Sequence, residues 1–341
     1  DDKQAFKWFL KAAMQGDVGA QSTIGSMYYV GKGVIQDDKQ AFKWFLKAAM
    51  QGDVGAQSTI GSMYYVGKGV IQDDKQAFKW FLKAAMQGDV GAQSTIGSMY
   101  YVGKGVIQDD KQAFKWFLKA AMQGDVGAQS TIGSMYYVGK GVIQDDKQAF
   151  KWFLKAAMQG DVAAQSTIGA RYSVGKGVIQ DDKQAVKWYR KSAEQGYSAA
   201  QFSLGARYIS GKGVIQSHKQ AGNWFLKSAE QGYAKAQYNL AFMYMNGYGV
   251  IQNYNQAVKW YRKAAEQGFA RAQYLLGSQY LLGRGLIQSN KEAYIWYAIA
   301  AANGDEDALE SRDLLAKVLS TPELEKAQEE ATKLYEIIKN K

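Results

Sequence analysis

Internal repetition is the feature that most constrains the fold of this chain. Residues 1–36, 37–72, 73–108 and 109–144 are identical, and four more copies follow through Gln288 with increasing divergence. A period of this length is typical of solenoids, in which each repeat is one supersecondary unit that contacts mainly its neighbours. The chain of 341 residues is also longer than a single globular core usually grows. We therefore expect an extended array of repeats.

Each copy has the sequence pattern of a helical hairpin. In the second copy, Asp37 or Asp38 can cap a helix whose apolar residues recur at spacings of three and four until Gly52. Asp53 can cap a second helix, which Gly67 ends in the left-handed conformation that glycine adopts at little cost. The apolar residues of the first helix are Ala41, Trp44, Phe45, Ala48 and Ala49, and those of the second are Ala56, Ile60, Met63 and Tyr64.

Gly61 lies inside the second helix of its hairpin, where glycine costs about 1 kcal/mol relative to alanine. Seven of the eight copies keep this glycine, and the seventh copy replaces it with Ala241. The pattern predicts that two helices approach closely here, and that a bulkier residue would disrupt their packing.

The C-terminal end departs from the repeat. Asn290 to Asn303 repeats the Trp-bearing helix, and a divergent helix is expected from about Asp305 to Leu319. Thr321 and Pro322, the only proline, are expected to start a last helix rich in Glu and Lys, which would cap the array with a polar surface. We predict a solenoid over residues 1–303, with identical copies in 1–144 and divergent copies in 145–288, and capping helices over 304–341.

The repeated motif resembles that of the Sel-one-like repeat (SLR) family, which is related to the tetratricopeptide solenoids. It reads Ala-Gln-x-x-Ile/Leu-Gly-x-x-Tyr-x-x-Gly-x-Gly-Val, then Ala-x-x-Trp and Lys-Ala/Ser-Ala-x-Gln-Gly. The resemblance covers about residues 1–303 and implies an all-α fold, a right-handed α/α superhelical solenoid. In the family's phasing, the Ile-Gly-x-x-Tyr helix comes first and lines the concave face. The resemblance also implies an adaptor or scaffold, often an exported bacterial protein, whereas the residues themselves leave the compartment open.

Composition argues against catalysis. The chain has one histidine, His218, and no cysteine, and most of its carboxylates lie at expected helix caps. We find no candidate zinc site, nucleophile–base pair or cofactor motif, so we expect a protein that is not an enzyme and needs no cofactor. The longest apolar run, Tyr294 to Ala302, is too short to span a bilayer.

The candidate partner-binding residues lie on the Ile-Gly helices of the last copies. In the second copy the corresponding exposed positions are Gly55, Ser58, Ser62 and Tyr65, whereas later copies place larger, aromatic and basic residues there. Rigid aromatic side chains and arginine often anchor protein interfaces. An alternative is that the aromatic residues pack between adjacent hairpins. The candidates are Phe202, Ile209, Lys235, Tyr238, Phe242, Met245, Arg271, Tyr274 and Leu281.

Other functions stay open on the sequence. The four identical copies could form a structural spacer or a self-associating rod, and exposed Phe6, Trp8 and Phe9 could join chains end to end. Lys39, Lys43 and Lys47, at four-residue spacing, and their equivalents in the other identical copies form a basic stripe that nucleic acid or an anionic polymer could bind. Asp residues dilute this charge in each identical copy, and no nucleic-acid-binding motif accompanies it, so we favour a protein or peptide ligand.

Overall fold

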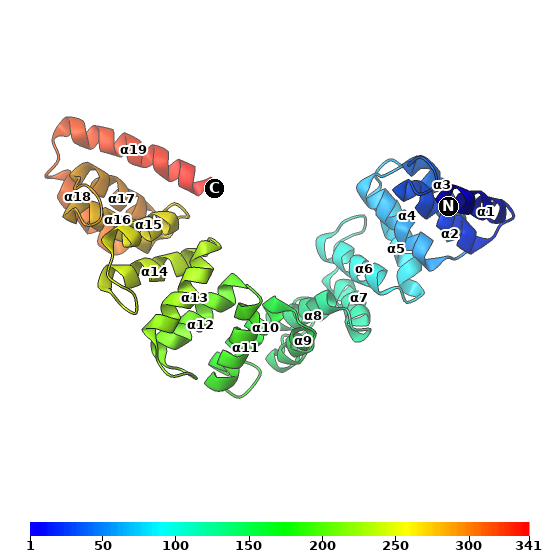
Figure 1. Ribbon diagram of the computed structural model, residues 1–341, viewed down its shortest axis with the longest axis horizontal. Coiled ribbons are helices and arrows are strands. Elements are labelled where there is room, and N and C mark those ends of the chain that lie inside the picture. The colour runs from blue at the N-terminus through cyan, green and yellow to red at the C-terminus, as the bar shows by residue number, and fades with distance from the viewer. Residues whose placement is uncertain (341) are drawn as a thin grey trace. The chain divides into compact units, whose positions relative to one another are not determined.

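The computed structural model describes residues 1–340, and in these residues it contains 19 α-helices and no strand (Figure 1). The chain divides into two compact units, one formed by residues 1–164 and 176–178, the other by 165–175 and the residues from 179 onward. None of the described helices is long and apolar enough to cross a membrane.

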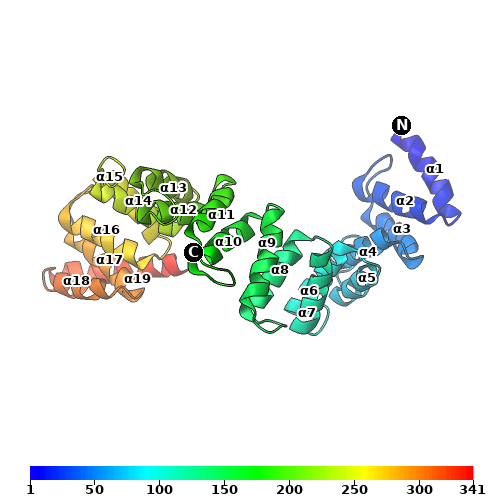
Figure 2. The same cartoon turned by 90° about the horizontal axis from the view of Figure 1, so that it is seen from below.

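Two kinds of helix alternate along the chain (Figures 1 and 2). The Trp-bearing helices are α1 (Asp2–Met14), α3 (Asp38–Met50), α5 (Asp74–Met86), α7 (Asp110–Met122), α9 (Asp146–Met158), α11 (Asp182–Glu194), α13 (His218–Glu230), α15 (Tyr254–Ala265) and α17 (Asn290–Ala302). The helices between them are α2 (Val18–Val30), α4 (Val54–Val66), α6 (Val90–Val102), α8 (Val126–Val138), α10 (Val162–Val174), α12 (Ser198–Ser210), α14 (Ala234–Asn246) and α16 (Ala270–Leu282).

The helix ends follow from the residues that the sequence pattern identifies. Asp37 accepts a hydrogen bond from the backbone N–H of Gln40 at 3.0 Å, and Asp53 accepts one from Ala56 at 2.6 Å. Gly67 ends α4 with φ of 75°, and its N–H donates to the Met63 carbonyl. The predicted caps and left-handed glycine are therefore confirmed in this copy.

Glycine inside the second helix marks a close helix approach, as predicted, in the copies that carry it. A Cβ atom at Gly61 would lie 2.9 Å from the ring of Phe81 in α5. The same distance recurs between Gly97 and Phe117. Only hydrogen at this position allows the phenyl ring of the next hairpin to lie directly against the backbone.

Buried glutamines join successive hairpins. Gln57 in α4 donates from Nε2 to the Ala49 carbonyl at 3.1 Å, and its own Oε1 accepts a bond from Gln87 at 2.8 Å. Gln93 and Gln123 repeat this arrangement in the next hairpin. Because a buried amide needs a partner, each hairpin satisfies a polar group of the one before it.

The helices that follow the last Trp-bearing helix cover its surface. α18 (Glu306–Ala316) and α19 (Thr321–Lys339) both contact α17, and α19 runs beside α17 in Figures 1 and 2. α19 begins with a capping box between Ser320 and Glu323 and buries Ala327, Ala331 and Ile338. Most of its charged side chains are exposed, but Glu330 pairs with Lys291 of α17 at 2.7 Å. The predicted polar cap is therefore present.

Candidate partner-binding surface

The nine candidate residues lie on three helices of the second unit, and their exposure differs. Lys235, Phe242 and Arg271 are exposed, and the other six are half-buried. Phe202 and Ile209 belong to α12, Lys235, Tyr238, Phe242 and Met245 to α14, and Arg271, Tyr274 and Leu281 to α16.

The aromatic candidates in the first half of each helix pack between hairpins, which is the alternative that the sequence left open. Tyr238 has its ring centroid 5.1 Å from that of Phe269 and 6.0 Å from that of Tyr261. Tyr274 lies 5.4 Å from Tyr297 in the same way. Phe202 likewise contacts the rings of Phe225 and Tyr233. These three rings contribute to the core as well as to the surface.

Arg271 is held by the C-terminal cap. Its guanidinium donates to Asp307 at 2.6 Å and to Asp305 at 3.4 Å, and it stacks 4.7 Å above the ring of Tyr274. The hydrogen bond to Asp307 and the charge of Asp305 raise the pKa of Arg271 further. Arg271 therefore ties α16 to α18, a role that was not predicted because Asp305 and Asp307 lie beyond the last full copy, which ends at Gln288.

A recurring ion pair closes the loop after each second helix in the identical copies. Lys104 lies 3.6 Å from Asp74 and 3.6 Å above the ring of Tyr65, which belongs to the preceding copy. Hydrogen bonding to Tyr65 and the charge of Asp74 raise the pKa of Lys104 above its ordinary value. We call this arrangement the Asp–Lys–Tyr clasp. It recurs around Lys68 and Lys140.

The seventh copy lacks the residues of the clasp. His218 occupies the position of the aspartate, Tyr248 that of the lysine and Ile209 that of the tyrosine. The rings of His218 and Tyr248 lie 5.9 Å apart, and Phe242 lies 6.0 Å from Tyr248. In the sequence, His218 stands out only as the single histidine. The signal that joins it to Tyr248 is the replacement of both ion-pair positions in one copy.

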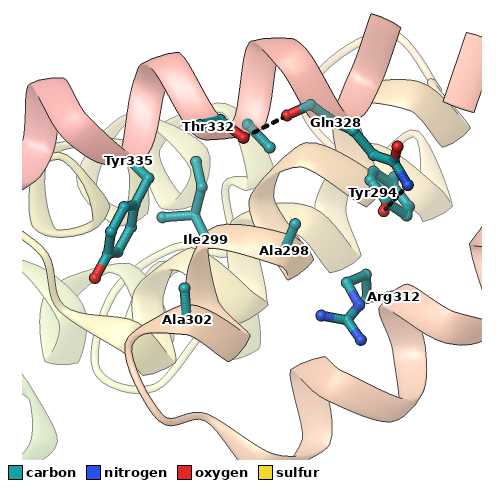
Figure 3. A pocket seen from close by; sticks show the side chains of 9 residues that line it. Tyr294, Ala298, Ile299, Ala302, Arg312, Gln328, Thr332 and Tyr335 are labelled. Carbon is teal, nitrogen blue, oxygen red and sulfur yellow. Dashed lines mark hydrogen bonds between the residues drawn. The ribbon is translucent and has the colours of Figure 1, made fainter. Parts of the chain in front are cut away.

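A pocket of about 220 Å³ lies between α17, α18 and α19 (Figure 3). Its wall includes Ala298, Ile299 and Ala302, and Arg312 and Tyr335 also line it. The side chain of Thr332 donates to the Gln328 carbonyl at 2.8 Å, and Arg312 donates to Asp313 at 2.6 Å. The polar groups named here are thus engaged within the fold, and the lining offers no histidine or carboxylate for acid–base chemistry.

Two further observations bear on the sequence predictions. Among residues 1–340, no three His, Cys, Asp or Glu side chains are grouped so that they could hold a metal ion. Trp8 is 63% exposed on α1, with Phe9 also exposed, whereas Phe6, also expected to be exposed, is half-buried with its ring 5.3 Å from that of Tyr28. End-to-end association through this helix stays a prediction.

Comparisons with known proteins identify the repeat. Two solved structures are each 32% identical to the chain: a protective antigen present in uropathogenic Escherichia coli strains displaying an SLR fold, and a Sel1 repeat protein from Oxalobacter formigenes. The match to the antigen has a TM-score of 0.70 and covers 99% of this chain and 88% of the antigen. The match to the Oxalobacter protein has a TM-score of 0.75 and covers 91% of this chain and 89% of that protein. No curated protein gives a significant match. The Sel1 repeat matches residues 1–17, 19–53, 55–89, 91–125, 127–161, 162–197, 198–233, 234–269 and 270–305.

These likenesses and the alternating helices confirm the predicted all-α solenoid of 36-residue helical hairpins. The boundary that sequence analysis placed between the solenoid and its cap, near residue 303, stays a prediction.

Proposed function

This chain belongs to the Sel1 repeat family, and we propose that it is a non-catalytic scaffold that binds a peptide or protein segment on its second unit. The proposed surface is the exposed face of α12, α14 and α16. Stacked hairpins of this kind present neighbouring helices side by side, so that one extended ligand can contact several repeats.

One observation supports the proposal: between the second and seventh copies the exposed residues of the helix change, whereas the buried positions stay apolar or small. Leu240 and Ala241 are buried in α14, as Ile60 and Gly61 are in α4. At the next position along the helix, however, the seventh copy has Phe242 where the second copy has Ser62. The side chain of Phe242 is 42% exposed. A large exposed aromatic residue on a rigid helix is the type of side chain that anchors interfaces.

The test is selection of peptides from a random display library on the full chain, followed by affinity measurement on variants. Phe242→Ser together with Lys235→Gly restores the two residues that the identical copies carry at these exposed positions. We expect the selected peptides to lose about tenfold or more in affinity, which corresponds to about 1.4 kcal/mol. Arg271 is left unchanged because its substitution would disturb the contact with α18.

The control changes the corresponding position in the first unit, where the identical copies carry serine. Ser98→Ala on α6 alters an exposed helix position of an identical copy and should leave the affinity unchanged. Equal binding by the wild type and the Phe242→Ser, Lys235→Gly variant would exclude this surface as the binding site.

A structural spacer is a second candidate, supported by the regularity of the first unit. The contact of Gly61 with Phe81 and that of Gly97 with Phe117 have the same length, as do the glutamine bonds of successive hairpins. Units joined by identical interfaces can be added or removed without creating a new contact. This suits a segment whose length, rather than surface, is its function.

A further inference from the structure

Three aromatic side chains of the seventh copy form a cluster on the surface of the second unit. His218 begins α13, Phe242 lies in α14, and Tyr248 follows α14 in the loop. Tyr248 contacts both other rings, with centroid distances of 5.9 Å and 6.0 Å. It is 49% exposed, and His218 and Phe242 are exposed as well. We call these three residues the aromatic cluster.

The cluster stands where earlier copies have an ion pair. The first six copies place Asp at the position of His218 and Lys at that of Tyr248, and the first four place Ser at that of Phe242. Rings left in water are unfavourable in proportion to their apolar area, whereas charged groups at the same place are well solvated. The substitutions therefore favour a ligand that covers the rings.

The stretch of sequence that contains the cluster, up to Glu266, is poor in carboxylates. Residues 211–265 contain seven Lys or Arg and a single acidic residue, Glu230, whereas the corresponding residues 31–85 contain eight Lys and five Asp. Glu230 ends the helix that His218 begins, so at a rise of about 1.5 Å per residue the two lie about 18 Å apart. Lys219 and Lys235 are exposed on the helices that carry two of the rings.

We infer that the aromatic cluster is the docking point for an acidic peptide segment that carries one aromatic or large aliphatic side chain. This inference rests on the proposed scaffold function. The apolar side chain covers Phe242 and Tyr248 and supplies most of the contact area. Carboxylates on either side of it are attracted by the uncompensated lysines of α13 and α14. A basic segment is disfavoured because it meets the same lysines.

The experiment uses three fluorescein-labelled peptides of about 12 residues on the full chain, measured by fluorescence anisotropy. The first is rich in Asp and Glu with one central Phe, the second replaces that Phe by Gly, and the third replaces the acidic residues by Lys. We expect the first peptide to bind, the second to bind about tenfold more weakly, and the third not to bind. Affinity for the first should fall between about 50 mM and 200 mM salt.

The decisive variant is His218→Asp with Tyr248→Lys, which restores the ion pair of the earlier copies. Because other copies of this chain carry the ion pair at the corresponding positions, the change is expected to preserve the fold, which circular dichroism checks. The acidic Phe peptide should bind this variant at least about tenfold more weakly. If the double variant does not fold, Tyr248→Ser removes the central ring with a smaller change. Asp38→His with Lys68→Tyr in the second copy is the matched control and should leave binding unchanged.

The outcomes separate the inference from the function on which it rests. Unchanged binding by the His218→Asp, Tyr248→Lys variant, equal or tighter binding of the basic peptide, or no binding of the acidic Phe peptide at about 1 mM would each overturn the inference. If display-selected peptides still depend on Phe242 in that case, the scaffold function stands and only the class of partner is wrong.

Discussion

At the scale of single residues, the spacing between neighbouring helices depends on a glycine, whose lack of a side chain allows a close approach. Gly97 in α6 faces the ring of Phe117 in α7, and the distance leaves room for hydrogen but not for a branched side chain. By contrast, Gly91 in the same helix has no close neighbour except the carboxylate of Asp89, 3.6 Å from where its Cβ would be. Two glycines of one helix therefore have opposite roles.

Gly97→Val should destabilise the first unit by at least about 1–3 kcal/mol, because Phe117 must move to accommodate two methyl groups. Gly91→Ala is the control and should be neutral or stabilising by up to about 1 kcal/mol, since alanine favours the helix. Urea unfolding followed by circular dichroism measures both. A Gly97→Val variant as stable as the wild type would contradict the predicted close packing.

Tyr261 in α15 provides a test by pH. Burial, followed by the nearby Tyr238, raises its pKa well above the ordinary value, so the folded chain keeps this proton when the unfolded chain begins to lose it. Above about pH 10 the free energy of unfolding of the wild type should therefore fall relative to that of Tyr261→Phe, by up to about 1.4 kcal/mol per pH unit. Urea midpoints of both proteins between about pH 8 and pH 11 measure this difference. Parallel curves would mean that Tyr261 ionises normally in the folded chain.

At the scale of helices and hairpins, neighbouring copies are linked by polar contacts as well as by apolar packing. Gln93 is buried and bonds both the end of its own Trp-bearing helix and Gln123 of the next. The Asp–Lys–Tyr clasp links three successive helices but is partly exposed, and we expect it to contribute little stability. Buried amides thus set the register between hairpins more strongly than the surface ion pairs.

Gln93→Ala should cost about 1–3 kcal/mol, because it removes one buried and one partly buried hydrogen bond and leaves a space between hairpins. Gln108→Ala, on an exposed loop position, should stay within about 0.5 kcal/mol of the wild type. Hydrogen exchange of the α5 to α7 amides measures the local effect. Similar exchange in the two variants would show that the glutamine bonds do not hold the hairpins together.

At the scale of the whole molecule, each unit is an array in which hairpins contact mainly the hairpins before and after them. Stability in such an array is approximately the sum of repeat and interface terms. The first unit contains the identical copies and part of the fifth copy, and the second contains the rest of the fifth, the later copies and the C-terminal cap.

Deleting residues 73–108 tests this division. Residues 37–72 would then join residues 109–144, which are identical to the deleted copy, so each remaining interface is one that already exists. We expect the same helicity per residue by circular dichroism and unchanged affinity for peptides that bind the second unit. A steep loss of affinity would instead indicate that the identical copies themselves bind the ligand, as in an avidity array.

The sequence by itself determined the repeat, its two helices, their caps and the close approach at Gly61, because each depends on local residue chemistry or on a strict period. The tertiary structure decided which of the candidate side chains are available to a partner and which are engaged within the fold. Arg271 is held by carboxylates that follow the last full copy, and Tyr238 and Tyr274 pack between hairpins. His218 lies beside Tyr248 only because α13 packs against α14, whereas Phe242 and Tyr248 are near each other in the sequence. Such contacts depend on where neighbouring helices lie, and the period of a sequence does not contain that information.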